Sequence, residues 1–163
     1  MVDFPLYNPG SMSTMATLLS NVEYAPASSP PFQSLVISSL DFEATVARLK
    51  QAITDLDLWL INEVNPQILL ERGGYAIQPA RQLFFFHPRY LVRLLGADPA
   101  AVVEIPLKLV VLQMPDGSVT VRHNHVEDLL SRYRGISGLA AELAEISFKL
   151  VTTVRQPVVG VAR

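Results

Sequence analysis

Apolar residues between positions 34 and 124 switch between the continuous runs of strands and the wider spacing of helices. Ser34 to Ser38 is a short β-branched run that predicts a strand. The next apolar positions recur at spacings of four, three and four, namely Phe42, Val46, Leu49 and Ile53. This spacing is typical of one face of an amphipathic helix. Asp41 suits the N-cap of that helix, because its carboxylate can accept free backbone N–H groups.

The middle of the chain predicts a strand, a helix and a hairpin. Leu83 to Phe86 is an aromatic strand, and Pro88 suits the first position of a helix, where no N–H is needed. Leu107 to Met114 and Ser118 to His125 form the two strands of the hairpin. Pro115-Asp116-Gly117 supplies its turn, since glycine can take a positive φ.

Other segments are shorter or lie towards the C-terminus. Asp57 to Val64 predicts a further strand, followed by a short helix over residues 68–70. We expect a long helix capped by Ser137, with a stop at Gln156-Pro157. Its inner positions recur at helical spacing, namely Leu139, Leu143, Ile146 and Leu150.

Strands and helices that are mixed rather than strictly alternating indicate an α+β fold. We expect an antiparallel sheet of four or five strands with helices packed on one face, plus an added C-terminal helix. The expected parts are an N-terminal arm (1–32), a core domain (33–135) and a C-terminal helix with its tail (136–163). The arm holds five of the twelve prolines, and Met12 to Val22 has the spacing of two or three helical turns. It is either mobile or docked on its own domain or a neighbour.

Composition narrows the classes of function. Half of the 163 residues are hydrophobic, yet no apolar run approaches the roughly 20 residues that cross a bilayer. We therefore expect no membrane association, and an apolar surface that forms a homodimer. The net charge is −2 and the cations are scattered, which argues against nucleic-acid binding. There is no cysteine and no basic residue before Arg48, so we expect no targeting segment and a cytoplasmic protein.

All three histidines fall at predicted strand ends. His123 and His125 are two residues apart and so share a face, and His87 follows another strand. Three imidazoles could hold Zn²⁺ or Fe²⁺ with one position open. The simpler interpretation is that these histidines lie at the rim of the core and bond to backbone carbonyls. No other cofactor is predicted.

Chain reversals point to a second candidate site, a cleft that would bind a small ligand. Its residues are His87, Pro88, Arg89 and Asp98. Asp98 could act there as an acid–base partner, but capping the turn at Pro99 explains it more simply. Arg89 could bind an anion at a helix start, or lie on a solvated face.

The chain resembles the domain of unknown function 302 family from about residue 34 to residue 124. The resemblance rests on the opening helix 42–49, the strand ending at a Pro turn, Ala97-Asp98-Pro99, Ile105-Pro106-Leu107 and the Asp116-Gly117 hairpin. It implies a sheet backed by helices and, often, a homodimer, and it implies no reaction. Where the family commonly has Gly-Asn-Pro, this chain has Phe86-His87-Pro88.

Three hypotheses follow from the sequence. The first is a non-enzymatic module that binds a small ligand or protein partner near the His87-Pro88 turn. The second is a histidine-dependent metal site with hydrolytic or redox activity. The third is a structural subunit that dimerises through its C-terminal helix.

Overall fold

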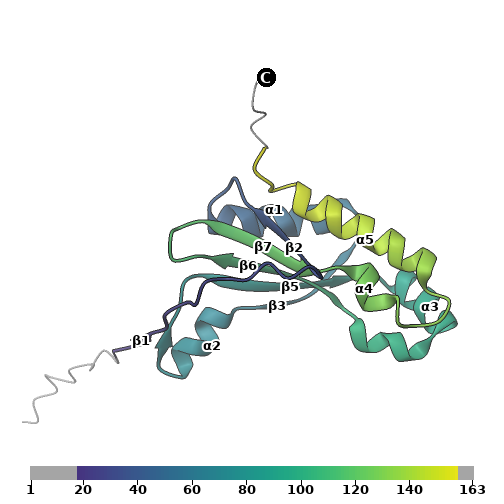
Figure 1. Cartoon of the computed structure of the whole chain (residues 1–163), viewed down its shortest axis with the longest axis horizontal. Coiled ribbons are helices and arrows are strands. Elements are labelled where there is room, and N and C mark those ends of the chain that lie inside the picture. Colours follow the sequence, from purple (N-terminus) through teal and green to yellow (C-terminus); the bar gives the residue numbers. More distant parts are fainter. Residues whose placement is uncertain (1–17, 158–163) are drawn as a thin grey trace, which may run out of the picture.

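The computed structural model describes residues 18–157, which form one sheet with helices around it (Figure 1). The elements are β1 (Ser20–Asn21), β2 (Gln33–Ile37), α1 (Phe42–Asp55), β3 (Trp59–Val64), α2 (Pro66–Arg72), β4 (Tyr75–Ala76), β5 (Ala80–Phe86), α3 (Pro88–Ala97), the 3₁₀ helix η1 (Pro99–Glu104), β6 (Leu107–Gln113), β7 (Val119–Asn124), α4 (Val126–Leu130) and α5 (Ser137–Thr152).

The main sheet has five strands in the order β2-β7-β6-β5-β3, and every neighbouring pair is antiparallel. The predicted α+β class and antiparallel sheet are therefore confirmed. The β6-β7 hairpin turns at Gly117, whose φ of 88° is open to glycine at little cost. A separate two-stranded parallel pair, β1 with β4, was not predicted.

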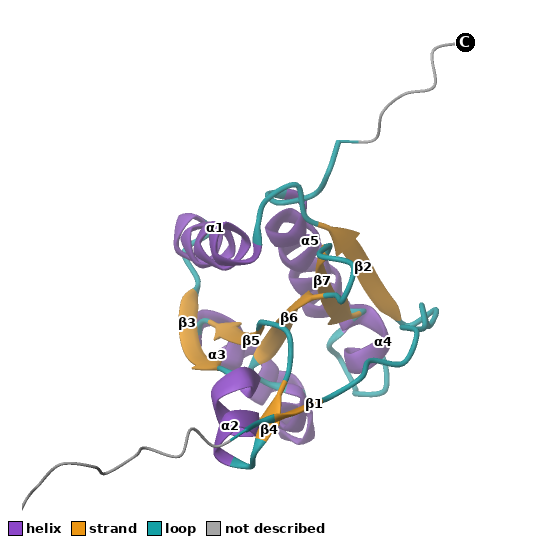
Figure 2. Cartoon of the chain, turned by 90° about the vertical axis from the view of Figure 1, so that its left-hand side faces the viewer, coloured by secondary structure: helices purple, strands orange, loops and turns teal. Residues whose placement is uncertain are grey.

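Helices α1 and α5 lie on one side of the sheet, and α2 with the β1-β4 pair lies on the other (Figure 2). Strand residues alternate between the two faces. On the α5 side they are buried, as with Leu83 and Phe85 of β5 and Leu109 and Val111 of β6. We call this side the helix face and the other side the open face.

The N-cap prediction for α1 is confirmed, because the backbone N–H of Ala44 donates to the Asp41 carboxylate at 2.8 Å. The predicted N-cap of α5, Ser137, is wrong. The helix begins at Ser137 itself, Ile136 takes the N-cap position, and no side chain bonds there. The helix also ends at Thr152, before the expected stop at residues 156–157.

The N-terminal arm contacts its own domain over its described part. The backbone N–H of Ser20 donates to the carbonyl of Gly74, and that of Val22 donates to Ala76. Farther along, Nη1 of Arg122 donates to the carbonyl of Ser28 at 3.0 Å. The helix expected over residues 12–22 is wrong for residues 20–21, which form β1, and residues 12–17 lie outside the described residues.

Within residues 18–157, no helix combines the length and apolar character needed to span a membrane.

The edge strand β3 exposes Trp59, Leu60 and Ile61. Such an apolar edge fits the expected homodimer, which stays a prediction.

Candidate functional site

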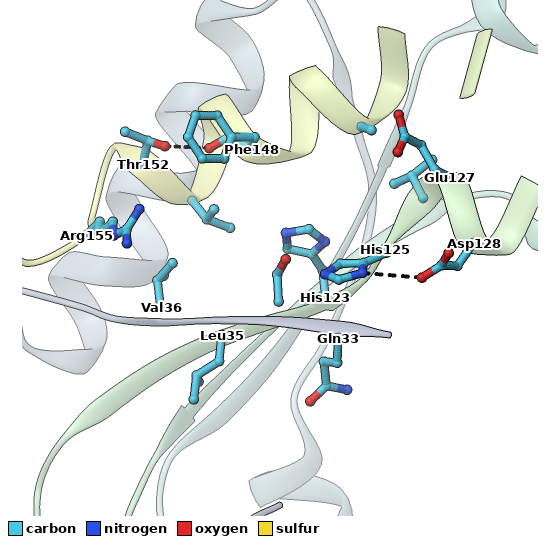
Figure 3. A pocket seen from close by; sticks show the side chains of 14 residues that line it. Gln33, Leu35, Val36, His123, His125, Glu127, Asp128, Phe148, Thr152 and Arg155 are labelled. Carbon is cyan, nitrogen blue, oxygen red and sulfur yellow. Dashed lines mark hydrogen bonds and ion pairs between the residues drawn. The ribbon is translucent and has the colours of Figure 1, made fainter. Parts of the chain in front are cut away.

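A groove of about 490 Å³ lies between the edge strand β2 and helix α5 (Figure 3). Ser34 and Val36 line it from β2, and Phe148 lines it from α5. His123 at the end of β7 and His125 just before α4 also line it. The groove therefore combines an apolar wall with two imidazoles.

A second cavity, of about 420 Å³, lies where β6 and β7 part. The pairing of these strands ends at Val110 with Arg122. Beyond that point β6 stays paired with β5 as far as Leu107, and β7 stays paired with β2 as far as Asn124. The sheet is therefore opened between its central strand β6 and the neighbouring β7 at this end.

The second cavity reaches both faces of the sheet. Phe84 and Lys108 line it from the open face, whereas His123 and the buried Ser147 line it from the helix face. The cavity therefore lies at the end of the sheet where β6 and β7 have separated, with walls from both faces. Gln33, His123 and Val126 line both this cavity and the groove. We call the two together the His123 cleft.

The two nitrogens of His123 have different surroundings. Nδ1 lies 3.0 Å from the carbonyl of Asn124, and since a carbonyl only accepts, Nδ1 carries the proton. Nε2 is buried without any hydrogen-bond partner among the described residues. His123 therefore presents an acceptor nitrogen, with no partner in the described part of the chain, where the two cavities meet.

Burial lowers the pKa of His123, and the nearby His125 lowers it further, although the hydrogen bond to Asn124 opposes this. In the unfolded chain a histidine titrates near pH 6.5. Below that pH the unfolded state binds the proton more readily than the folded state does. The contribution of His123 to stability is therefore present at neutral pH and is lost as the pH falls.

We expect acidification from pH 8 to pH 5 to destabilise the protein, by at most about 1.4 kcal/mol per pH unit for this single proton. Urea unfolding of the parent and His123→Leu measures the effect, because the variant lacks the titrating group. His87→Asn is the control, since it removes a histidine outside the cleft and keeps a capping side chain. An equal loss of stability on acidification in the parent and in His123→Leu would contradict the assignment.

His125 lies beside His123 and is held by a carboxylate. Its Nδ1 is 3.3 Å from Oδ2 of Asp128, a pair that Figure 3 shows at the end of the groove near α4. The backbone N–H of His125 donates to the carbonyl of Phe32 at 2.8 Å, which fixes the start of β2 against it. Both imidazoles therefore have their Nδ1 atoms engaged.

Comparison with known proteins gives the family. Residues 35–155 match the family described as Domain of unknown function DUF302, which is most of the chain. The chain belongs to this family. The match continues past residue 124, where the sequence resemblance ended, and includes α5.

One solved structure supports the same fold for this DUF302 chain. It is the crystal structure of an uncharacterized conserved DUF302 protein from Bacillus stearothermophilus, with a TM-score of 0.71 and 19% sequence identity. The likeness covers 77% of this chain and 100% of that one. At this identity it concerns the fold alone. No curated protein is similar enough to count as a match.

The residues of the predicted ligand site bond to their own neighbours in this DUF302 domain. Nδ1 of His87 accepts from the backbone N–H of Arg89 at 3.1 Å and caps α3, which starts at Pro88. The Arg89 guanidinium donates to the carbonyl and carboxylate of Asp57. None of the three residues in the His87–Arg89 turn lines the His123 cleft.

Asp98 is explained by its local bonds. One carboxylate oxygen accepts from the backbone N–H of Ala100 at 3.1 Å, and the other accepts from that of Arg134 at 3.3 Å. The capping interpretation of Asp98 is therefore confirmed, and its side chain lines neither cavity. The His123 cleft of this DUF302 domain lies at the end of β7, and the predicted ligand site at the His87 turn stays a prediction.

The structure brings two of the three histidines into one cavity. His123 and His125 share the groove, and His87 lines neither cavity. Across residues 18–157, no three His, Asp, Glu or Cys side chains lie close enough together to hold one metal ion.

Sequence reasoning identified His123 and His125 and missed the other residues of the cleft, among them Ser147, Lys108 and Arg122. Ser147 is 2% exposed on α5, at a place in the buried stripe between Leu143 and Leu150. A serine inside an apolar helical stripe was the available signal. Lys108 and Arg122 lie on the open face of the hairpin. The alternation of side chains along the two strands was the signal that could have placed both on this one face.

Proposed function

We propose that this DUF302 domain is a binding module that holds a small organic ligand in the His123 cleft. The observation that carries the proposal is the opening of the sheet between β6 and β7, which creates a cavity with walls on both faces. Each cavity has a volume within the range of about 300–1,000 Å³ that small-molecule sites occupy.

The lining of the cleft supports a ligand with an apolar body. Phe84, Val110 and Ile105 present apolar surface in the second cavity, and Phe148 and Val36 do so in the groove. A few polar groups among apolar walls are typical of sites that bind by burial and orient by hydrogen bonds.

The surroundings of His123 favour binding over catalysis. Its Nδ1 bonds to a backbone carbonyl, and among residues 18–157 no hydroxyl or carboxylate is hydrogen bonded to its Nε2. An imidazole that activates a protein nucleophile has that nucleophile within hydrogen-bond reach. We therefore propose a module that retains its ligand without converting it.

A fragment screen on the ¹⁵N-labelled full chain tests the proposal. We expect bound fragments to shift the amide signals of residues shared by both cavities, Gln33, His123 and Val126. The amides of Arg89 and Asp98 serve as the internal control, because they lie outside the cleft. Shifts confined to the α3 start, or no fragment that shifts the cleft signals, would contradict the proposal.

A metal site is the second candidate, and one observation favours it. Metal-binding imidazoles usually have their other nitrogen hydrogen bonded, and both His123 and His125 have Nδ1 engaged. Elemental analysis of the purified protein tests this candidate. A stoichiometric transition metal that is lost in His123→Ala and kept in His87→Ala would support it, and no bound metal would remove it.

A further inference from the structure

Two cations line the second cavity from the open face, and no carboxylate of residues 18–157 pairs with either. Lys108 and Arg122 both line it, on neighbouring strands at the point where β6 and β7 part. Both side chains lie on the open face, Lys108 beside β5 and Arg122 beside β2, so this side of the cavity carries positive charge from two directions.

Both cations are held by neutral groups. Nζ of Lys108 lies 5.7 Å from the centre of the Phe84 ring. Nη1 of Arg122 donates to the carbonyl of Ser28 and to Oε1 of Gln33, at 3.0 and 2.9 Å. The amide nitrogen of Gln33 in turn donates to Asn124. These bonds orient the two cations and leave their positive charge uncompensated.

The one carboxylate that lines this cavity has a partner of its own. Oε1 of Glu104 accepts a hydrogen bond from the Tyr133 hydroxyl at 2.9 Å, and this bond raises the pKa of Tyr133. This hydrogen bond therefore holds the carboxylate of Glu104 on the side of the cavity near Tyr133. The charges that line the cavity are two cations and this single anion.

We propose that the second cavity selects a small organic carboxylate. Its charged end lies on the side of the cavity that Lys108 and Arg122 line, where a charge-assisted hydrogen bond to either cation is strong and short. Its apolar body packs against Phe84, Val110 and Ile105, in the gap between the strands. This inference rests on the proposed binding function and adds the chemical class of the ligand.

Octanoate and octanamide test the inference on the full chain, because they share one apolar body and differ in the charge of the head group. We expect octanoate to bind at least about tenfold more tightly at pH 7.5 and low salt by isothermal titration calorimetry, since one good charge contact is worth about 1.4 kcal/mol or more. Lys108→Gln should reduce this preference several-fold.

Lys149→Gln is the matched control, because Lys149 pairs with Glu145 on the solvent-exposed side of α5 and lines neither cavity. It should keep the preference for octanoate. Equal affinity for the two compounds, or an unchanged preference in Lys108→Gln, would overturn the carboxylate inference and leave the binding function intact. No binding of either compound or of any screened fragment would instead overturn the binding function itself.

Discussion

Val110→Trp should lower the affinity of the chain for octanoate by at least about tenfold. Val110 lines the second cavity, at the last pair that joins β6 to β7. An indole at this position would occupy the space where the apolar body of a ligand packs. Losing that burial removes the main favourable term, and about 1.4 kcal/mol already gives a tenfold loss.

The matched control is Val92→Trp. Val92 lies on α3, is 69% exposed and lines neither cavity, so the same substitution there should leave octanoate binding unchanged. Calorimetry gives the affinities, and a ¹⁵N spectrum shows that each variant is folded. A folded Val110→Trp protein that binds octanoate like the parent would place the ligand elsewhere.

Leu143→Ala should destabilise the protein by about 2–5 kcal/mol, the usual cost of removing a buried leucine side chain. Leu143 is 1% exposed and lies in the core, so α5 is part of the packed unit and does more than extend it. Urea unfolding followed by circular dichroism gives the free energy of unfolding.

Phe148→Ala is the control on the same helix, because Phe148 is 58% exposed beside the groove. We expect it to change the free energy of unfolding by no more than about 1 kcal/mol. Similar small effects at both positions would show that α5 adds little to the stability of the core. Such a result would leave the helix free to act as a separate interaction element.

Elements with a strong local pattern could be predicted from the sequence. The helix 42–55 has a regular apolar stripe and an aspartate cap, and both are read within a few residues. The β6-β7 hairpin has its turn chemistry at Pro115 to Gly117. The β1-β4 pair was missed because its strands have two residues each and join segments more than fifty residues apart.

The candidate site was harder to predict, because its position depends on strand pairing and not on composition. His87 stands at a clear chain reversal, yet that reversal is explained by a helix cap. The cleft exists because, beyond Val110 and Arg122, β6 stays paired with β5 while β7 stays paired with β2. No short sequence pattern indicates where two paired strands separate. His123 and His125 were identified as sharing a face, but their role as the meeting point of two cavities needed the fold.

The turn of the β6-β7 hairpin is a suitable site for attaching a probe to this protein. Pro115 is exposed and lies at the opposite end of the hairpin from Leu107 and Asn124, roughly 20 Å away at about 3.3 Å per strand residue. The chain has no cysteine, so Pro115→Cys would provide a single thiol. A fluorophore or a sensor surface attached there would leave the entrance to the cleft unobstructed.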